Sequence, residues 1–321
     1  MIDVTAMGEL LIDFACQAKD KEGYPTMADH PGGAPCNFLA ALSKFGLNTA
    51  FIGKVGADAF GNMLMGTLKK YGICTDGVVQ DTETFTTMAF VTFDGNGDRQ
   101  FSFARKPGAD TRLTFQECRL DLIDEAKVFH FGTLSLTDEP ARDATRQLVA
   151  YAKSKGKLIT FDPNLRLPLW QRAEQAKEEI LWGLRQADIV KISEEEVVFL
   201  WGCSAEEGAR KLLEEFGVKL VFVTMGADGS FYANGNASGY TTTIKVKTVD
   251  TTGAGDIFGG SAVSQVLKMG KDPADLNQEE LDYIAAFAST AATLSTRVFG
   301  GITSVPNYEE VLANMPKGSL S

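Results

Sequence analysis

Short apolar runs alternate along the chain with longer stretches in which apolar residues recur every three or four positions. The short runs are typical of buried parallel strands and the longer stretches of amphipathic helices, so the pattern predicts an α/β fold with a mostly parallel sheet covered by helices. We predict strands at 4–12, 49–55, 128–134, 158–162, 189–192 and 220–224. We predict helices at 37–45, 60–71, 140–154, 173–185, 205–216, 254–268 and 279–294.

One region departs from this alternation. Residues 85–93 are β-branched and aromatic, residues 94–97 read Asp-Gly-Asn-Gly, and a second such stretch follows at 99–103. This turn chemistry predicts a hairpin. Together with the polar stretch 16–30, the hairpin would form a small β subdomain beside the main sheet. An edge hairpin without function is the alternative.

Composition narrows the class of protein. A chain of 321 residues that is 44% hydrophobic can bury one large core plus a small appendage. Its net charge of −11 argues against nucleic acid or an anionic membrane as a partner. No apolar run reaches the roughly 18 residues of a membrane span, and the N-terminus lacks a signal-peptide pattern. Five dispersed cysteines and two histidines indicate a reduced cytoplasmic protein, and argue against zinc, disulfides or a Ser-His-Asp hydrolase.

The most informative run extends from Asp250 to Asp256 and reads Asp-Thr-Thr-Gly-Ala-Gly-Asp. Because Gly253, Ala254 and Gly255 lack large side chains, backbone N–H groups can approach a ligand there, and a helix N-terminus favours a phosphate or a developing oxyanion. Asp256 beside such a site would act as a base for a hydroxyl that attacks a phosphoryl group. The alternative is a glycine-rich turn with Asp256 as a helix N-cap.

A second motif lies near the start of the chain. Gly32 and Gly33 form a turn, Pro35 stands near the first position of a helix, and Gly46 closes that helix. The two motifs, in this order and this far apart, resemble the two signatures of the pfkB (ribokinase-like) carbohydrate kinases. An ordinary P-loop kinase is not supported, because no G-x-x-x-x-G-K-[ST] motif occurs in the sequence.

The resemblance covers nearly the whole chain and implies a ribokinase-like three-layer α/β/α fold in a single domain, 1–321. It implies that a lid, built from about 14–31 and 84–106, closes over the sugar and pairs two subunits. It also implies that ATP and a sugar are the substrates and that Mg²⁺ is required.

The proposed sugar site combines the end of the first predicted strand, the first motif and the segment after the hairpin. Asp13 stands near the end of the first predicted strand, where open α/β sheets bind ligands; a surface or turn position is the alternative. By the resemblance, Asp13 accepts hydrogen bonds from sugar hydroxyls, while Gly32, Gly33 and Asn37 contact the sugar. Arg105, in Phe-Ala-Arg-Lys-Pro-Gly-Ala-Asp, resembles the arginine of fructokinases that reaches the sugar. A solvated arginine is the alternative.

Two further segments resemble the nucleotide and magnesium sites of the family. The small-residue segment after the strand at 220–224 is either a hairpin turn or a passage near the nucleotide, with Thr224, Gly226 and Gly229 as candidates beside Gly253 and Gly255. The acidic run 193–196 is either the start of a helix or the family's N-x-x-E motif, in which Glu196 orders Mg²⁺ through water. Ser193 replaces the usual asparagine of that motif.

Arg166, in the run Asp-Pro-Asn-Leu-Arg-Leu-Pro-Leu-Trp, could stabilise charge on the transferring phosphoryl group. A helix-capping loop is the alternative, and fructokinases carry a similar run. Family members often use a monovalent cation such as K⁺ beside the anion site. Asp250 and the carbonyl of Thr252 match that cation site, with Gly300 and Ser304 as further contributors.

The sequence therefore favours an ATP-dependent fructokinase that phosphorylates D-fructose to fructose 6-phosphate. One alternative is a 2-keto-3-deoxygluconate kinase, whose substrate carboxylate Arg105 could pair, or another kinase of the family. The other is a sugar-sensing protein on a kinase fold. Loss of the base or the glycines would favour the sensor, and both are present.

Overall fold

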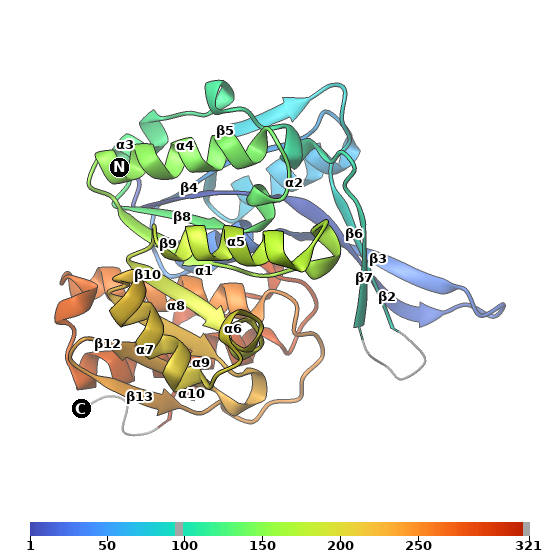
Figure 1. The fold of residues 1–321 in the computed structure, drawn as a ribbon. Coiled ribbons are helices and arrows are strands. Elements are labelled where there is room, and N and C mark those ends of the chain that lie inside the picture. Colours follow the sequence, from blue (N-terminus) through green and yellow to red (C-terminus); the bar gives the residue numbers. More distant parts are fainter. Residues whose placement is uncertain (94–98, 317–321) are drawn as a thin grey trace.

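The computed structural model describes residues 1–93 and 99–316, and in this part of the chain it contains two sheets (Figure 1). The larger sheet has nine strands in the order β13-β12-β11-β10-β9-β8-β1-β4-β5. Neighbouring strands are parallel from β5 to β11, and β12 pairs antiparallel with both β11 and β13, so the predicted mostly parallel sheet is confirmed. The strands are β1 (Val4–Met7), β4 (Thr49–Gly56), β5 (Ile73–Asp81), β8 (Val128–Gly132), β9 (Leu158–Asp162), β10 (Ile189–Ser193), β11 (Leu220–Thr224), β12 (Ser230–Asn234) and β13 (Ser238–Thr241).

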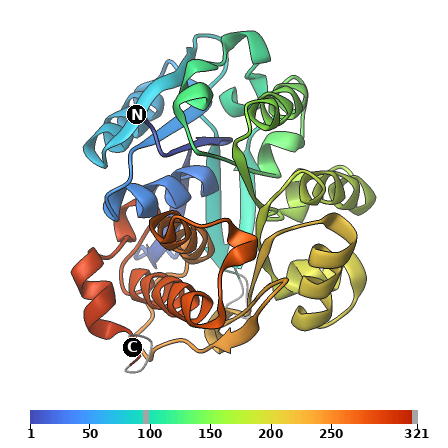
Figure 2. The ribbon, with the colours of Figure 1, turned by 90° about the vertical axis from the view of Figure 1, so that its left-hand side faces the viewer.

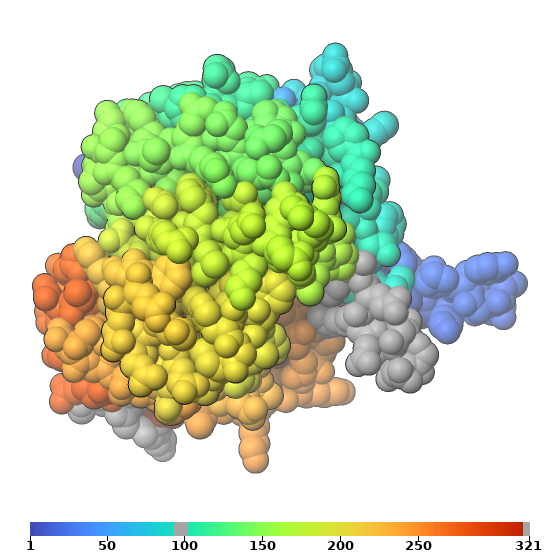
Figure 3. All heavy atoms as spheres, viewed as in Figure 1, coloured from blue at the N-terminus to red at the C-terminus, as the bar shows by residue number. Residues whose placement is uncertain are grey.

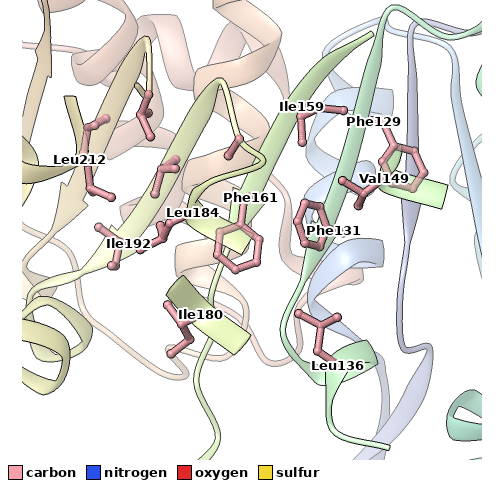
Figure 4. Close-up of a cluster of buried hydrophobic side chains, with 14 of the residues drawn as sticks. Phe129, Phe131, Leu136, Val149, Ile159, Phe161, Ile180, Leu184, Ile192 and Leu212 are labelled. Carbon is pink, nitrogen blue, oxygen red and sulfur yellow. The ribbon is translucent and has the colours of Figure 1, made fainter. Parts of the chain in front are cut away.

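The central strands are apolar on both sides because both faces of this sheet are covered. Along β10, Val190 and Ile192 belong to one core cluster, whereas Ile189 belongs to another on the opposite face. Figure 4 shows the first cluster, in which Phe131 and Phe161 from neighbouring strands lie side by side. Their ring centroids are 4.7 Å apart, so these aromatic residues of β8 and β9 pack against each other in the middle of the sheet.

Helices cover the two faces and complete the predicted three layers (Figure 2). All seven predicted helices form within a few residues of their expected bounds. On one face pack α3 (Asp121–Glu125), α4 (Ala141–Ser154), α5 (Ala173–Leu184), α6 (Glu194–Trp201) and α7 (Ala205–Phe216). On the other pack α1 (Ala34–Lys44), α2 (Ala59–Lys70), α8 (Ala254–Met269), α9 (Gln278–Ser295) and α10 (Tyr308–Asn314). None of the described helices is long and apolar enough to cross a bilayer.

The smaller sheet is the predicted β subdomain, which we call the lid. Its strands, in the order β3-β2-β6-β7, project from the main body in Figures 1 and 3. The predicted hairpin is confirmed, because β6 and β7 pair antiparallel, while the predicted turn at 94–97 lies outside the described residues. The strands of the lid are β2 (Leu11–Lys19), β3 (Pro25–Gly32), β6 (Met88–Phe93) and β7 (Arg99–Ala104).

The single strand predicted at 4–12 is wrong. The chain leaves the main sheet after β1 and enters the lid as β2, with a break at Gly8. Gly8 has φ 154°, and a Cβ at this position would lie 2.6 Å from the Cγ of Pro35 in α1. The apolar pattern continues across this break because both strands are buried there, so the pattern alone does not show it. Asp13 consequently belongs to the lid.

Candidate active site

A cleft of about 730 Å³ lies between the main body and the lid, a volume typical of small-molecule sites. It is bordered by the C-terminal ends of the parallel strands, by the N-terminal ends of α1, α6 and α8, and by lid strands β2 and β7. The residues around it are Glu9, Leu11, Asp13, Gly33, Ala34, Asn37, Phe103, Leu134, Asn164, Leu165, Arg166, Leu167, Pro168, Lys191, Ser193, Glu195, Glu196, Phe199, Thr251, Thr252, Gly253 and Asp256.

The glycine-rich run forms the start of α8. Its N-cap is Gly253, which has φ 74°, and a Cβ there would lie 2.8 Å from the Cα of Gly301. Only glycine accommodates both the left-handed backbone and this close approach. Asp256 lies inside the first turn of the helix, so the alternative that made it a simple N-cap is wrong. The run thus presents a helix N-terminus to the cleft, as the sequence predicts.

Asp256 is buried at the floor of the cleft. The Nδ2 of Asn37 donates a hydrogen bond to the Oδ2 of Asp256 at 2.8 Å. Burial raises the pKa of Asp256 to about 7, and the negative charge of Asp162 adds to this shift; Lys191, Asn37 and Arg166 oppose it. A carboxylate with this pKa is suited to take a proton near neutral pH.

Asp13 enters the cleft from lid strand β2. A Cβ on the facing Gly32 would lie 2.1 Å from the Oδ2 of Asp13, so the glycine makes room for this carboxylate. The neighbouring Gly33 has φ 114° and packs against the carbonyl of Glu9. Burial raises the pKa of Asp13 to about 7; the positive charge of Arg166 opposes the shift, while the negative charge of Asp256 adds to it. The structure therefore brings Asp13, Gly33 and Asn37 to the same cleft as the candidate base.

Arg166 also lies on the wall of the cleft, in the loop after β9. Its Nη1 donates to the carbonyl of Leu165 at 3.1 Å. Its positive charge lowers the pKa of both Asp13 and Asp256, which places it within electrostatic reach of the two carboxylates. A role in stabilising phosphoryl charge stays a prediction.

Arg105 is not among the residues that border this cleft in the described part of the chain. Its side chain is 2% exposed, and its Nε and Nη2 bind the Oδ2 of Asp110 at 2.8 and 2.7 Å. Nη1 donates to Thr137 and Nη2 to the carbonyl of Leu134. A buried guanidinium needs such partners, because leaving it unpaired would cost several kcal/mol. The alternative of a solvated arginine is therefore wrong, and contact between Arg105 and the sugar stays a prediction.

Two charged residues of the cleft were missed from the sequence. Lys191 lies in the middle of β10, and its Nζ contacts both carboxylate oxygens of Asp162, at 2.9 and 3.1 Å. Glu9 accepts a hydrogen bond from the N–H of Ala34 at 2.8 Å, and burial raises its pKa to about 8. In both cases the available signal was a charged residue inside an apolar run, where burial without a partner would be costly.

Glu196 lies in the first turn of α6, which begins at Glu194 after the N-cap Ser193, as the helix-start interpretation of the acidic run predicts. Its Oε1 accepts from the N–H of Leu165 at 2.7 Å and its Oε2 from the N–H of Ser193 at 2.8 Å, which forms a capping box. Among the described residues, no group of three or more His, Cys, Asp or Glu could hold a metal ion directly. The carboxylate of Glu196 is the kind of oxygen donor that a hydrated Mg²⁺ uses, and its role in ordering that ion through water stays a prediction.

The candidate residues for the monovalent cation meet around Asp250. Its Oδ1 accepts from the N–H and the hydroxyl of Thr252, at 3.0 and 2.8 Å, and its Oδ2 accepts from the N–H of Gly300 at 3.0 Å. Ser304 lies nearby in the same loop, where its hydroxyl donates to the carbonyl of Gly301. The structure therefore ties the C-terminal loop to the start of the glycine-rich run.

The segment with Thr224, Gly226 and Gly229 is the turn of a hairpin, because Thr224 pairs with Ser230 across β11 and β12. A Cβ on Gly229 would lie 1.8 Å from the carbonyl oxygen of Thr241, so this glycine is required by packing. The segment does not border the cleft described above. Its contact with a nucleotide stays a prediction.

A cleft that combines a helix N-terminus with the buried carboxylates Asp13 and Asp256 has the features expected of an enzyme that phosphorylates a sugar. Residues 1–308 match the model of the pfkB family of carbohydrate kinases, and the chain belongs to this family. Curated relatives include fructokinase-1 of Zea mays, which is 41% identical over 318 residues and 98% of either chain. Fructokinase-2 of Solanum lycopersicum is 39% identical over 98% of this chain and 97% of its own.

Solved structures agree with this assignment. The ATP-bound fructokinase of Xylella fastidiosa superimposes with a TM-score of 0.88 at 29% identity, over 97% of both chains. A fructokinase variant of Vibrio cholerae O395 with bound fructose, ADP and potassium ion gives a TM-score of 0.87 at 30% identity, over 98% of this chain and 99% of that one. The ribokinase-like fold predicted from the two motifs is therefore confirmed.

Proposed function

We propose that this chain is an ATP-dependent fructokinase, which transfers the γ-phosphoryl group of ATP to D-fructose and yields fructose 6-phosphate and ADP. The observation that carries this proposal is that Asp256, at the start of α8, and Asp13, from the lid, border the same cleft. The plant relatives and the fructose-bound structure from Vibrio cholerae support fructose as the acceptor.

In the proposed reaction, Asp256 takes the proton of the primary hydroxyl while the hydroxyl oxygen attacks the γ-phosphorus. Its pKa of about 7 leaves it largely ionised at slightly alkaline pH and still basic enough to accept a proton. Backbone N–H groups of 253–256 stabilise the negative charge that develops on the transferring group. Arg166, which also borders the cleft, adds positive charge.

Fructose is recognised by hydrogen bonds in the proposed complex. Asp13 accepts from sugar hydroxyls, and the backbone at Gly32 and Gly33 lets the sugar approach closely. The Nδ2 of Asn37 is already bound to the base, but its buried Oδ1 has no hydrogen-bond partner in the described structure. A sugar hydroxyl that donates to this oxygen would satisfy it, which supports the assignment of Asn37 to the sugar site.

The nucleotide contacts proposed from the sequence are those of Thr224, Gly226 and Gly229 with the phosphates and ribose, in addition to Gly253 and Gly255. Mg²⁺, when bound with ATP, would neutralise charge on the phosphates.

The ion sites are proposed on the oxygen atoms present. Glu196 would hold the hydration shell of Mg²⁺. The carboxylate of Asp250 and the carbonyl of Thr252, with Gly300 and Ser304, would supply the oxygen ligands that K⁺ prefers.

Two further proposals concern the assembly and its compartment. We propose that two copies pair through their lids, because Tyr24, between β2 and β3, and Phe85, before β6, are 69% and 74% exposed. The five cysteines are free thiols, which supports a reducing compartment such as the cytoplasm.

A substrate panel tests the proposed function. The purified chain is assayed for ADP release with MgATP and fructose, 2-keto-3-deoxygluconate, ribose or glucose. We expect kcat/KM for fructose to exceed that for every other sugar by about tenfold or more, because a pocket built for hydroxyls rejects analogues that leave buried groups unpaired.

Preference for the keto acid would overturn the substrate but not the kinase assignment. Arg105, which would pair with the carboxylate of that acid, is already bound to Asp110, and this favours fructose. If the chain binds fructose but releases no ADP with any of the sugars, the result would instead favour the sensor.

A further inference from the structure

Lys191 occupies an unusual place in the sheet. It lies in the buried middle of β10, where side chains alternate between the two faces. Val190 and Ile192 face the cluster beneath α5 and α7, so Lys191 shares the opposite face with Ile189, toward α8. Its side chain is only 11% exposed, and a largely buried lysine on a central strand is costly unless its ammonium has a specific function or partner.

Two glycines of α8 create the space for this lysine. A Cβ on Gly255 would lie 3.1 Å from the Nζ of Lys191 and 3.6 Å from its Cε, and a Cβ on Gly259 would lie 3.9 Å from its Cδ. Because the glycines are one helical turn apart, they share one face of the helix. The lysine stem therefore lies along this glycine face, and its ammonium reaches the first turn of α8.

The ammonium is surrounded by carboxylates. Asp162 contacts it directly, at 2.9 Å, and burial alone would lower the pKa of Lys191. The negative charges of Asp162, Glu196 and Asp256 outweigh burial and raise that pKa, so Lys191 is positively charged at neutral pH.

The charges around the cleft indicate a function for this ammonium. Of the residues that border the cleft in the described structure, Lys191 and Arg166 are the cationic ones, whereas Glu9, Asp13, Glu195, Glu196 and Asp256 are acidic. ATP brings several negative charges to this acidic cleft. The ammonium lies beside the helix N-terminus that faces the transferring group, so the two sources of positive potential converge on one point.

We propose that Lys191 is a catalytic residue whose ammonium binds a non-bridging oxygen of the phosphoryl group during its transfer. Asp162 is the positioning residue that orients this ammonium. The inference rests on the proposed kinase function. The bond between the γ-phosphorus and the bridging oxygen of ADP breaks while the bond to the sugar oxygen forms. The sugar proton goes to Asp256, and Lys191 keeps its own protons throughout.

A merely structural role makes a different prediction. If Lys191 only neutralises Asp162, the double variant Lys191→Met/Asp162→Asn removes both charges and should work as well as the parent. Under the proposal, the double variant regains stability but not turnover. Lys191→Met alone leaves Asp162 unpaired and tests folding, so both variants are compared by melting temperature and by turnover.

The expected result for the double variant is a melting temperature near that of the parent and a kcat lower by about 10²–10³-fold, the effect of losing one positioned donor to the transition-state charge. Lys191→Arg should retain part of the turnover. Lys219→Met is the matched control, since Lys219 forms a 2.8 Å pair with Asp272 and does not border the cleft. Its kcat should be unchanged.

A binding measurement separates transition-state contact from general damage. Calorimetry with MgADP, aluminium fluoride and fructose probes the planar phosphoryl mimic, and MgADP alone is the reference. We expect the double variant to bind MgADP within threefold of the parent but to lose about 10²-fold or more in the effect of aluminium fluoride.

Recovery of parent kcat by the double variant, or an unchanged effect of aluminium fluoride, overturns the role of Lys191. These outcomes differ from failure of the proposed function. If the parent prefers another sugar, the assignment of fructose as the substrate is overturned. The parent and the Lys191 variants are then compared with that sugar. A parent inactive on every sugar overturns both.

Discussion

The pH dependence of fructose phosphorylation should reveal two carboxylates, Asp256 and Asp13, that must both be ionised. Each has a pKa raised to about 7, mainly by burial. A group with this pKa is about 9% ionised at pH 6 and about 91% at pH 8. If the base and the sugar acceptor are both needed, kcat/KM for fructose should fall about 100-fold between pH 8 and pH 6, with a limiting slope of two.

Removing one of the two groups should simplify this profile. In the variant Asp13→Asn, only Asp256 still titrates, so kcat/KM should fall about tenfold over the same interval with a slope of one. The assay measures ADP release at low fructose and saturating MgATP from pH 5.5 to 8.5, with coupling enzymes in excess. A parent slope of one or less, or identical profiles for parent and Asp13→Asn, would refute the two-carboxylate reasoning.

Unfolding at low pH does not explain the expected loss. The folded-state pKa of each group lies above its unfolded value of 3.8, so the stability that each contributes is fully present below about pH 4. That stability is lost as the pH rises through about 7. Asp13→Asn should accordingly raise the melting temperature at pH 8. The corresponding gain in the free energy of unfolding should be at most a few kcal/mol. A lower melting temperature at pH 8 would show that the carboxylate of Asp13 is paired.

Three substitutions test the remaining assignments. Asp256→Asn should lower kcat by about 10²–10⁴-fold with fructose affinity by calorimetry nearly unchanged; retention of half the activity would remove it as the base. Gly32→Ala should raise KM for fructose about tenfold or more, because the new Cβ would lie 2.1 Å from the Oδ2 of Asp13. Its control, Gly66→Ala in α2, meets nothing within 4 Å and should leave KM unchanged. Arg105→Lys should destabilise the fold by about 1–3 kcal/mol in urea titration, because it loses several buried hydrogen bonds. An unchanged midpoint would contradict the buried network.

Part of the site follows from the sequence because its determinants are local. Gly253, Ala254 and Gly255 precede an apolar periodic stretch, and a helix that begins there presents free N–H groups whatever packs around it. Asp256 then falls in the first turn by counting residues alone. The helices were predictable for the same reason, since the apolar residues of each buried helix face recur at regular spacing within one segment of the chain. The lid hairpin also depends on turn chemistry within a few residues.

The rest depends on partners far away in the chain. Whether the apolar run at 4–12 forms one strand or two depends on Gly8, whose positive φ and lack of a Cβ fit the close approach of Pro35 in α1. The Arg105 side chain could reach a sugar or stay inside, and the choice is made by Asp110 together with Thr137 and Leu134. A flexible charged side chain takes the direction in which its charge is best compensated, and local sequence does not contain that information.

Lys191 also shows which features follow from the local sequence and which depend on the tertiary structure. Its sequence neighbours determine that it lies in a buried strand, and the alternation of side chains determines which face it shares. Only the tertiary structure places Asp162 beside its ammonium and the glycine face of α8 along its stem. The sequence by itself therefore determined the fold class, the glycine-rich helix start and the position of the candidate base, Asp256. The tertiary structure decided which charges meet in the cleft, because that depends on segments brought together only when the sheet and its helices pack.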